Sequence, residues 1–99
     1  MEKISGIELV FIYGSYVSGE AHAASDIDLM VIGDVPDRDL APAVARVERR
    51  LKRQIDYALF SRSEAEQRAE AKGEFVREVL LGPKIVLIGS PDDRLLRVA

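Results

Sequence analysis

Two aspartates separated by a single residue, Asp26 and Asp28, open the apolar run DIDLMVI at residues 26–32. Residues i and i+2 of a strand lie on the same face, so both carboxylates would project to one side of a sheet. Aspartate is a poor strand former, and two like charges on one face repel each other. A divalent cation bound between them would remove that repulsion, because Mg²⁺ prefers carboxylate oxygens. The sequence therefore predicts a metal site at the start of a strand.

Composition and charge narrow the class of protein. The chain has 99 residues, of which 47% are hydrophobic and 31% charged, as in a soluble globular protein. This length predicts a single domain over residues 1–99. The net charge of −3 argues against non-specific binding of nucleic acid. The lack of cysteine excludes thiolate metal sites, and no apolar run is long enough to span a membrane, so we expect a cytoplasmic protein without a membrane partner.

Strands alternate with helices in the expected order of elements. Apolar runs rich in β-branched and aromatic residues predict strands at residues 7–13, 26–32, 55–60 and 84–88. A helix between the second and third strands is predicted by one apolar stripe, formed by Leu40, Val44, Val47 and Leu51. This order predicts an α/β (α+β) domain with a small mixed sheet of about four strands and helices packed mainly on one face.

The segment between the third and fourth strands predicts two further helices. Ser61 and Glu64 have the spacing of a capping box, which opens a helix over about residues 62–72. Its inner side carries alanines in place of large apolar residues, so we expect this helix to be exposed and weakly held. A second short helix follows around residues 75–80.

A glycine-serine pair and a third aspartate complete a candidate site. Gly14 and Ser15 follow the first strand, where glycine permits close approach of a ligand and a helix N-terminus favours phosphate. Asp56 interrupts the apolar run of the third strand. Each feature alone has an ordinary explanation: a turn for Gly14-Ser15, a cap for Asp26 and a solvent-facing edge residue for Asp56. Together they favour a site for metal and phosphate.

The motif GSYVSG…SDIDLMV, followed by a strand with a single aspartate, resembles the nucleotidyltransferase fold of the DNA polymerase beta superfamily. It is most similar to the minimal nucleotidyltransferase (MNT) group. The residues that the resemblance assigns to nucleotide binding are Gly14, Ser15, Tyr16 and Ser25. Those that it assigns to catalysis and to two Mg²⁺ ions are Asp26, Asp28 and Asp56. It also implies that Asp56 helps to activate the incoming hydroxyl group.

The resemblance further implies a reaction and a role. Members of the family transfer a nucleoside monophosphate from an NTP, here expected to be ATP, to a hydroxyl group. MNT antitoxins act on or bind a HEPN-type ribonuclease toxin, so the expected partners are an NTP and such a toxin. The alternative is a non-catalytic module that binds nucleotide or a partner, in association with a DNA-binding domain. Ser18, where many relatives carry a basic residue, favours the module, whereas the complete set of carboxylates favours the enzyme.

Other features bear on partners. Only residues 1–6 precede the first strand, where relatives usually have a full helix, so we expect one face of the sheet to be bare in this chain. Either another subunit covers that face, or an upstream segment is missing. The strand at 84–88 is either buried or an edge that pairs in a homodimer. His22, the only histidine, is expected in a solvated loop. A solvated helix face is expected for the basic residues Arg46, Arg50 and Arg53.

Overall fold

The computed structural model describes residues 6–14, 26–71 and 75–97. Its strands are β1 (Ile7–Tyr13), β2 (Ile27–Gly33), β3 (Ile55–Phe60) and β4 (Lys84–Ile88). Its helices are α2 (Asp37–Leu51), α3 (Arg62–Glu70), α4 (Phe75–Leu81) and the 3-10 helix η1 (Arg94–Arg97). The four expected strands are all present, but β2 begins one residue later than predicted, so Asp26 lies before the strand. None of the described helices is long and apolar enough to cross a membrane.

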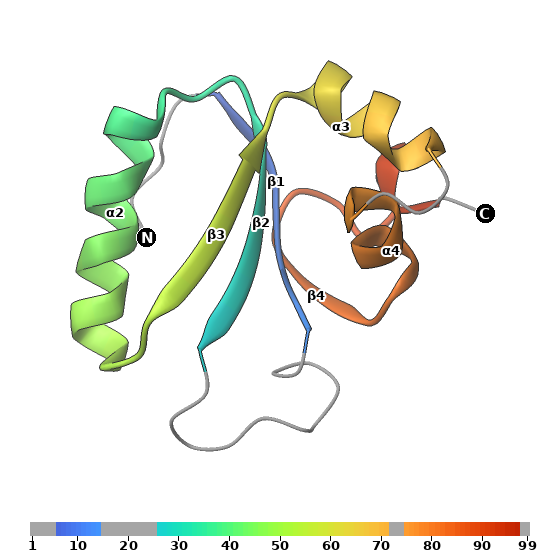
Figure 1. The fold of residues 1–99 in the computed structure, drawn as a ribbon. Helices are drawn as coiled ribbons and strands as arrows, with labels where there is room; N and C mark the ends of the chain where they lie inside the picture. The colour runs from blue at the N-terminus through green and yellow to red at the C-terminus, as the bar shows by residue number, and fades with distance from the viewer. Residues whose placement is uncertain (1–5, 15–25, 72–74, 98–99) are drawn as a thin grey trace.

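The strands form one mixed sheet in the order β3-β2-β1-β4 (Figure 1). β1 pairs antiparallel with both β2 and β4, whereas β2 and β3 are parallel. The parallel pair follows from α2, which carries the chain from the end of β2 back to the start of β3. As a result β1 ends at the same edge of the sheet at which the other three strands begin, and β4 is an edge strand, which is one of the two alternatives that the sequence left open.

Helices cover both faces of the sheet (Figure 1). On one face, Met30 and Ile32 of β2 pack with residues of α3 and α4. On the other face, Val31 packs with Leu40 and Val44 of α2. The α+β class and the four-stranded mixed sheet are confirmed; α3, α4 and η1 lie on one face, and α2 covers the other. The central strands are apolar on both sides, and each side needs a cover.

The bare face that the sequence predicts is limited to β4. Ile85 and Leu87 of β4 project on the same side of the sheet as α2, and each is 47% exposed. α2 covers β2 and β3 on that side and leaves these two side chains uncovered. The apolar stripe of α2 is also only half buried, since Val47 and Leu51 are 45% and 49% exposed. α2 therefore contacts the sheet mainly through its first half.

Helix α3 packs on the sheet through its alanines, as its sequence predicts. Ala65 and Ala69 are buried, because small side chains let the helix approach the sheet closely. The N-cap is the predicted one, with the Ser61 hydroxyl accepting a 3.1 Å hydrogen bond from the Glu64 amide. The expected exposure is confirmed for most of the other side chains of α3, and how firmly the helix is held stays a prediction.

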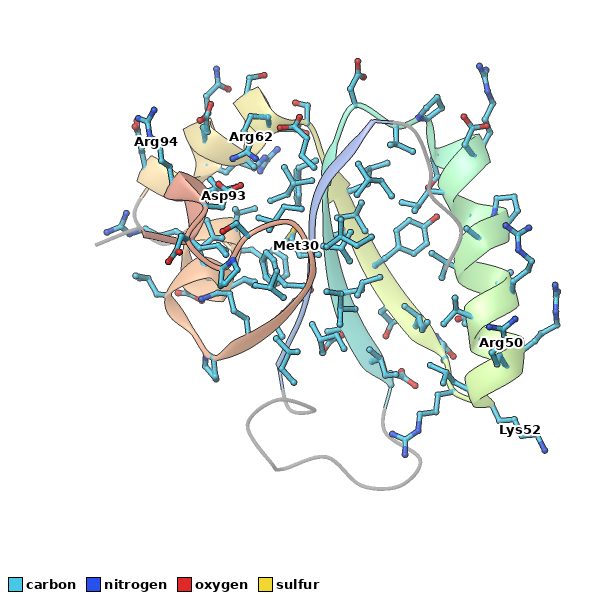
Figure 2. All side chains as sticks on the ribbon, turned by 180° about the vertical axis from the view of Figure 1, so that it is seen from behind. Met30, Arg50, Lys52, Arg62, Asp93 and Arg94 are labelled. Atoms are coloured by element: carbon cyan, nitrogen blue, oxygen red, sulfur yellow. The ribbon has the colours of Figure 1, made fainter. Side chains whose placement is uncertain are left out.

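An ion pair joins α3 to the C-terminal segment (Figure 2). The Arg62 guanidinium donates two hydrogen bonds to the Asp93 carboxylate, at 2.7 and 2.8 Å, and a third, at 3.1 Å, to Glu8 of β1. Hydrogen bonding from Arg62 lowers the pKa of Asp93 from its ordinary value, against the opposing effect of burial. Because the contact is bidentate and half-buried, it stabilises the fold more than an exposed ion pair does.

We expect Asp93→Asn to lower the free energy of unfolding at pH 7 by about 2 kcal/mol, since it removes a charge-assisted bidentate contact. The folded-state pKa of Asp93 is depressed, so its contribution is present above the unfolded pKa of about 3.9 and is lost as pH falls through the folded value. Urea unfolding between pH 2 and 7 measures this. The control Glu66→Gln, at an exposed position of α3, should change stability by less than about 0.5 kcal/mol. A constant difference between wild type and Asp93→Asn down to pH 2 would contradict the assignment.

Candidate active site

Two of the predicted carboxylates face each other across neighbouring strands. Asp28 of β2 and Asp56 of β3 are direct partners in the parallel register. Neighbouring strands lie about 4.8 Å apart, and residues directly opposite each other share a face of the sheet. Asp28 is also the antiparallel partner of Tyr13 on β1. The carboxylates therefore form part of a row that runs across the edge of the sheet where β2 and β3 begin.

Gly14 fits closely against Asp28. Its φ is +81°, in the left-handed region that favours glycine. A Cβ atom at this position would lie 2.7 Å from the Asp28 Oδ2 atom, well inside van der Waals contact. The glycine directly after β1 therefore allows the backbone to pass close to the carboxylate. A site that brings a phosphate next to a carboxylate-bound cation requires such a close approach.

Backbone hydrogen bonds fix the position of Asp56. The Glu48 carboxylate of α2 accepts a 2.7 Å hydrogen bond from the Ile55 amide, and the Gln54 carbonyl accepts one of 3.0 Å from the Ile27 amide. The Gln54 side-chain amide donates a 3.1 Å hydrogen bond to Asp56 Oδ1. The start of β3 is thus tied to α2 and to β2, which sets the register of the two carboxylates.

The electrostatics of the row agree with this geometry. The pKa of Asp28 is raised by burial, and further by the negative charges of Asp56 and Asp26. The pKa of Tyr13 is raised for the same reasons, first by burial and then by Asp28 and Asp56. The site is thus a place of concentrated negative charge, in which a bound cation would be stabilised.

The carboxylates suit a magnesium ion through their chemistry. Mg²⁺ usually binds one or two carboxylates together with substrate phosphates, and Asp28 and Asp56 supply hard oxygen atoms side by side. Over residues 6–14, 26–71 and 75–97, no three acidic or histidine side chains gather into a metal-binding group. Asp26, which lies exposed before β2, acts on Asp28 through its charge. The residues present therefore fit an ion that completes its coordination with phosphate oxygens.

The sequence prediction and the structure overlap at four residues. Gly14, Asp28 and Asp56 lie together, and Asp26 precedes β2. Three predicted nucleotide-binding positions lie outside the described residues: Ser15, Tyr16 and Ser25. Ser18 and His22 lie outside them too.

Sequence reasoning missed two members of the row. Tyr13 pairs with Asp28 on one side and with Lys84 of β4 on the other. Tyr13 is the last residue of a strand and Lys84 the first residue of another, and neither interrupts an apolar run as Asp28 does. Only the strand order and register bring them beside the carboxylates, so the sequence contained no local signal for them.

A model of the nucleotidyltransferase domain family matches residues 1–88. The chain belongs to the nucleotidyltransferase domain family. It is thus an enzyme of the nucleotidyl-transferring class, and the predicted resemblance is confirmed. No curated protein matches the chain.

Two solved structures share the fold of this nucleotidyltransferase. One is a toxin–antitoxin crystallised with AMP-PNP, with 20% sequence identity, a TM-score of 0.66, and coverage of 96% of this chain and 72% of that chain. The other is a mutant of the toxin–antitoxin MntA-HpeT with two aspartate-to-glutamate substitutions. Its sequence identity is also 20%, the match covers 96% of this chain and 72% of that chain, and the TM-score is 0.62. At this identity the likeness establishes the nucleotidyltransferase fold.

We expect Gly14→Ala to lower the free energy of unfolding by at least about 1–2 kcal/mol, because alanine is strained at positive φ and its Cβ would displace the Asp28 carboxylate. Gly82→Ala is the matched control, since its Cβ would meet only carbonyl oxygens at 3.5 and 3.7 Å. Combining Gly14→Ala with Asp28→Ala should recover the steric part in a double-mutant cycle. Equal effects of the two glycine substitutions would show that Gly14 is not held against Asp28.

We expect Asp28→Asn to raise the melting temperature by about 2–4 °C in metal-free buffer at pH 7, because it removes a charge that is disfavoured first by burial and then by repulsion from Asp56 and Asp26. The raised pKa of Asp28 means that its ionisation destabilises the folded state. The gain should therefore be complete above the folded pKa and disappear as pH falls toward the unfolded value of about 3.9. Asp34→Asn, at an exposed position after β2, is the control for net charge. A lower melting temperature for Asp28→Asn at pH 7 would refute the repulsive pairing.

Proposed function

We propose that this nucleotidyltransferase transfers AMP from ATP to a hydroxyl group of a protein, as the antitoxin partner of a HEPN-type toxin. The observation that carries the proposal is the pairing of Asp28 with Asp56 beside Gly14, on a chain of this family. Transfer of a phosphoryl group to a hydroxyl uses paired carboxylates that bind a cation, and a nearby backbone that a phosphate can approach closely.

The structural neighbours support the role. One is a toxin–antitoxin with AMP-PNP, an analogue of ATP. In the other, the two substituted aspartates are two positions apart, which is the spacing of Asp26 and Asp28. That spacing supports the assignment of these residues as the acidic pair of an antitoxin nucleotidyltransferase.

Asp26, Asp28 and Asp56 would hold magnesium. When bound, Mg²⁺ neutralises negative charge on the phosphates and on the reacting oxygen atoms. Gly14, which leaves the backbone free of side-chain atoms beside Asp28, would let the phosphate chain approach the carboxylates. We assign the remaining predicted positions, Ser15, Tyr16 and Ser25, to contacts with the nucleotide.

Asp56 is the proposed base of the reaction. Its carboxylate would orient the acceptor hydroxyl and accept its proton. The acceptor oxygen forms a bond to the α-phosphorus, and the bond from that phosphorus to the oxygen bridging to the β-phosphate breaks. Pyrophosphate leaves with the electron pair, and the acceptor carries the AMP group. Gln54, which donates to Asp56 Oδ1, would keep the carboxylate oriented.

The second candidate is a module that binds nucleotide or a protein partner without transfer. It is favoured by the lack of a three-ligand metal group among the described residues. Transfer of label distinguishes the two functions, because a module binds ATP without moving its α-phosphate to another molecule.

The test is transfer of label from α-labelled ATP to protein in a lysate of the source organism, with Mg²⁺ and the purified chain. We expect one labelled protein with wild type and with the control Asp34→Asn. We expect no label with the double variant Asp26→Asn/Asp28→Asn, and a rate about 10²–10⁴-fold lower with Asp56→Asn. A parallel reaction with γ-labelled ATP should add no label that depends on the purified chain, because the γ-phosphate leaves in the pyrophosphate. Labelling that persists in the double variant would refute the assignment of the acidic pair, and ATP binding without any transfer would favour the module.

A further inference from the structure

The row that contains the carboxylates ends in a lysine. Across the sheet in the order β3-β2-β1-β4, direct register partners are Asp56 with Asp28, Asp28 with Tyr13, and Tyr13 with Lys84. Because direct partners share a face, all four side chains project on the same side of the sheet. Two anionic groups, a phenol and an ammonium group therefore line one edge.

The packing of neighbouring residues supports the same face for Lys84. Val86, two residues further along β4, packs in the core on the α3 and α4 side. The Tyr13 ring makes edge contacts with Phe11 and Phe75 on that side, with centroid distances of 6.3 and 5.9 Å. The irregularity in the pairing of β1 and β4 lies between Val10 and Phe11, beyond this end of the strand. The register at Lys84 is thus regular.

The Lys84 ammonium group has no hydrogen bond or ion pair with any residue in the described part of the chain. It is half-buried at the start of β4. Two strand spacings separate Lys84 from Asp28, roughly 10 Å between backbones. The flexible lysine stem can bring the ammonium group back across Tyr13 toward the carboxylates. An extended anion that begins near Asp28 would reach Lys84.

A group of cationic residues near this edge lies on the opposite face of the sheet. A shallow hollow at the end of α2 is lined by Glu48, Arg49, Lys52, Arg53 and Gln54. Since α2 packs against the face that carries Val31, Arg49 and Lys52 of α2 and its C-cap lie behind the sheet as seen from the carboxylates, whereas Gln54 lies at the edge and contacts Asp56. Lys84, unlike Arg49 and Lys52, projects on the face of the row and at its edge.

We propose that Lys84 binds the β- and γ-phosphates of the nucleotide and stabilises the pyrophosphate that leaves. This inference rests on the proposed function. Lysine is a common point-charge ligand for phosphate. The α-phosphate would lie beside Asp28 and Asp56, and the phosphate chain would run over Tyr13 toward β4. Lys84 would thus make the site selective for a nucleoside triphosphate over a monophosphate.

The test is the dissociation constant for ATP and for AMP, each with Mg²⁺, measured by calorimetry on wild type and three variants. Lys84→Gln should weaken ATP binding about tenfold, because it removes one charge-assisted contact, and should leave AMP binding unchanged. Lys84→Arg should retain ATP affinity within about threefold, since it keeps the charge. Arg49→Gln, which removes one charge on the opposite face, should not change either constant.

The outcomes separate this inference from the proposed function. If Lys84→Gln binds ATP as tightly as wild type, or weakens ATP and AMP equally, the role of Lys84 is overturned while the proposed function stands. If Arg49→Gln weakens ATP binding as much as Lys84→Gln, the effect is one of net charge and the assignment is also overturned. If wild type binds no ATP, both fall. Thermal unfolding of each variant confirms that it is folded.

Discussion

Asp28 and Asp56 repel each other, and the paired strands hold them side by side nevertheless. Partial burial, and then the repulsion, raise the pKa of Asp28, so its ionised form is disfavoured when no cation is bound. Three contacts keep the pair in place: Gly14 against Asp28, the Gln54 amide on Asp56, and the Glu48 carboxylate on the Ile55 amide. A charge arrangement that weakens the fold is typical of a binding site, in which the ligand relieves the cost.

Stability is supplied at a distance from this edge. Leu9, Phe11, Met30 and Ile32 fill the centre of the sheet and are fully buried. Arg62 and Asp93 close the opposite end of the same face, where they tie α3 to the C-terminal segment. The edge with the carboxylates concentrates negative charge on Asp28 and Asp56, which a cationic ligand would neutralise. One end of the sheet thus contributes to the stability of the fold, and the other end carries the candidate binding site.

The local parts of the site could be predicted from sequence because they interrupt a pattern. Asp28 and Asp56 stand inside apolar runs, and Gly14 follows one, so each was visible without a structure. Tyr13 and Lys84 were not, because their place depends on which strands are neighbours and in what register.

The helices show what periodicity can and cannot predict. The alanines expected on the inner side of α3 are buried, because small side chains let the helix approach the sheet closely. The periodicity of α2 identified one apolar stripe, of which Leu40 and Val44 are buried whereas Val47 and Leu51 are half-exposed. Periodicity identifies the apolar face of a helix and not how much of it the sheet covers.

The carboxylates and Lys84 lie on strands that differ in their position in the sheet. The carboxylates lie on β2 and β3, whereas Lys84 lies on the edge strand β4, which pairs only with β1. Edge elements with fewer contacts open at lower free energy than central ones. Opening of β4 would remove the proposed phosphate ligand while leaving the paired aspartates in position. Affinity for the phosphate chain would then depend on the stability of the edge strand, and affinity for the metal on the centre of the sheet.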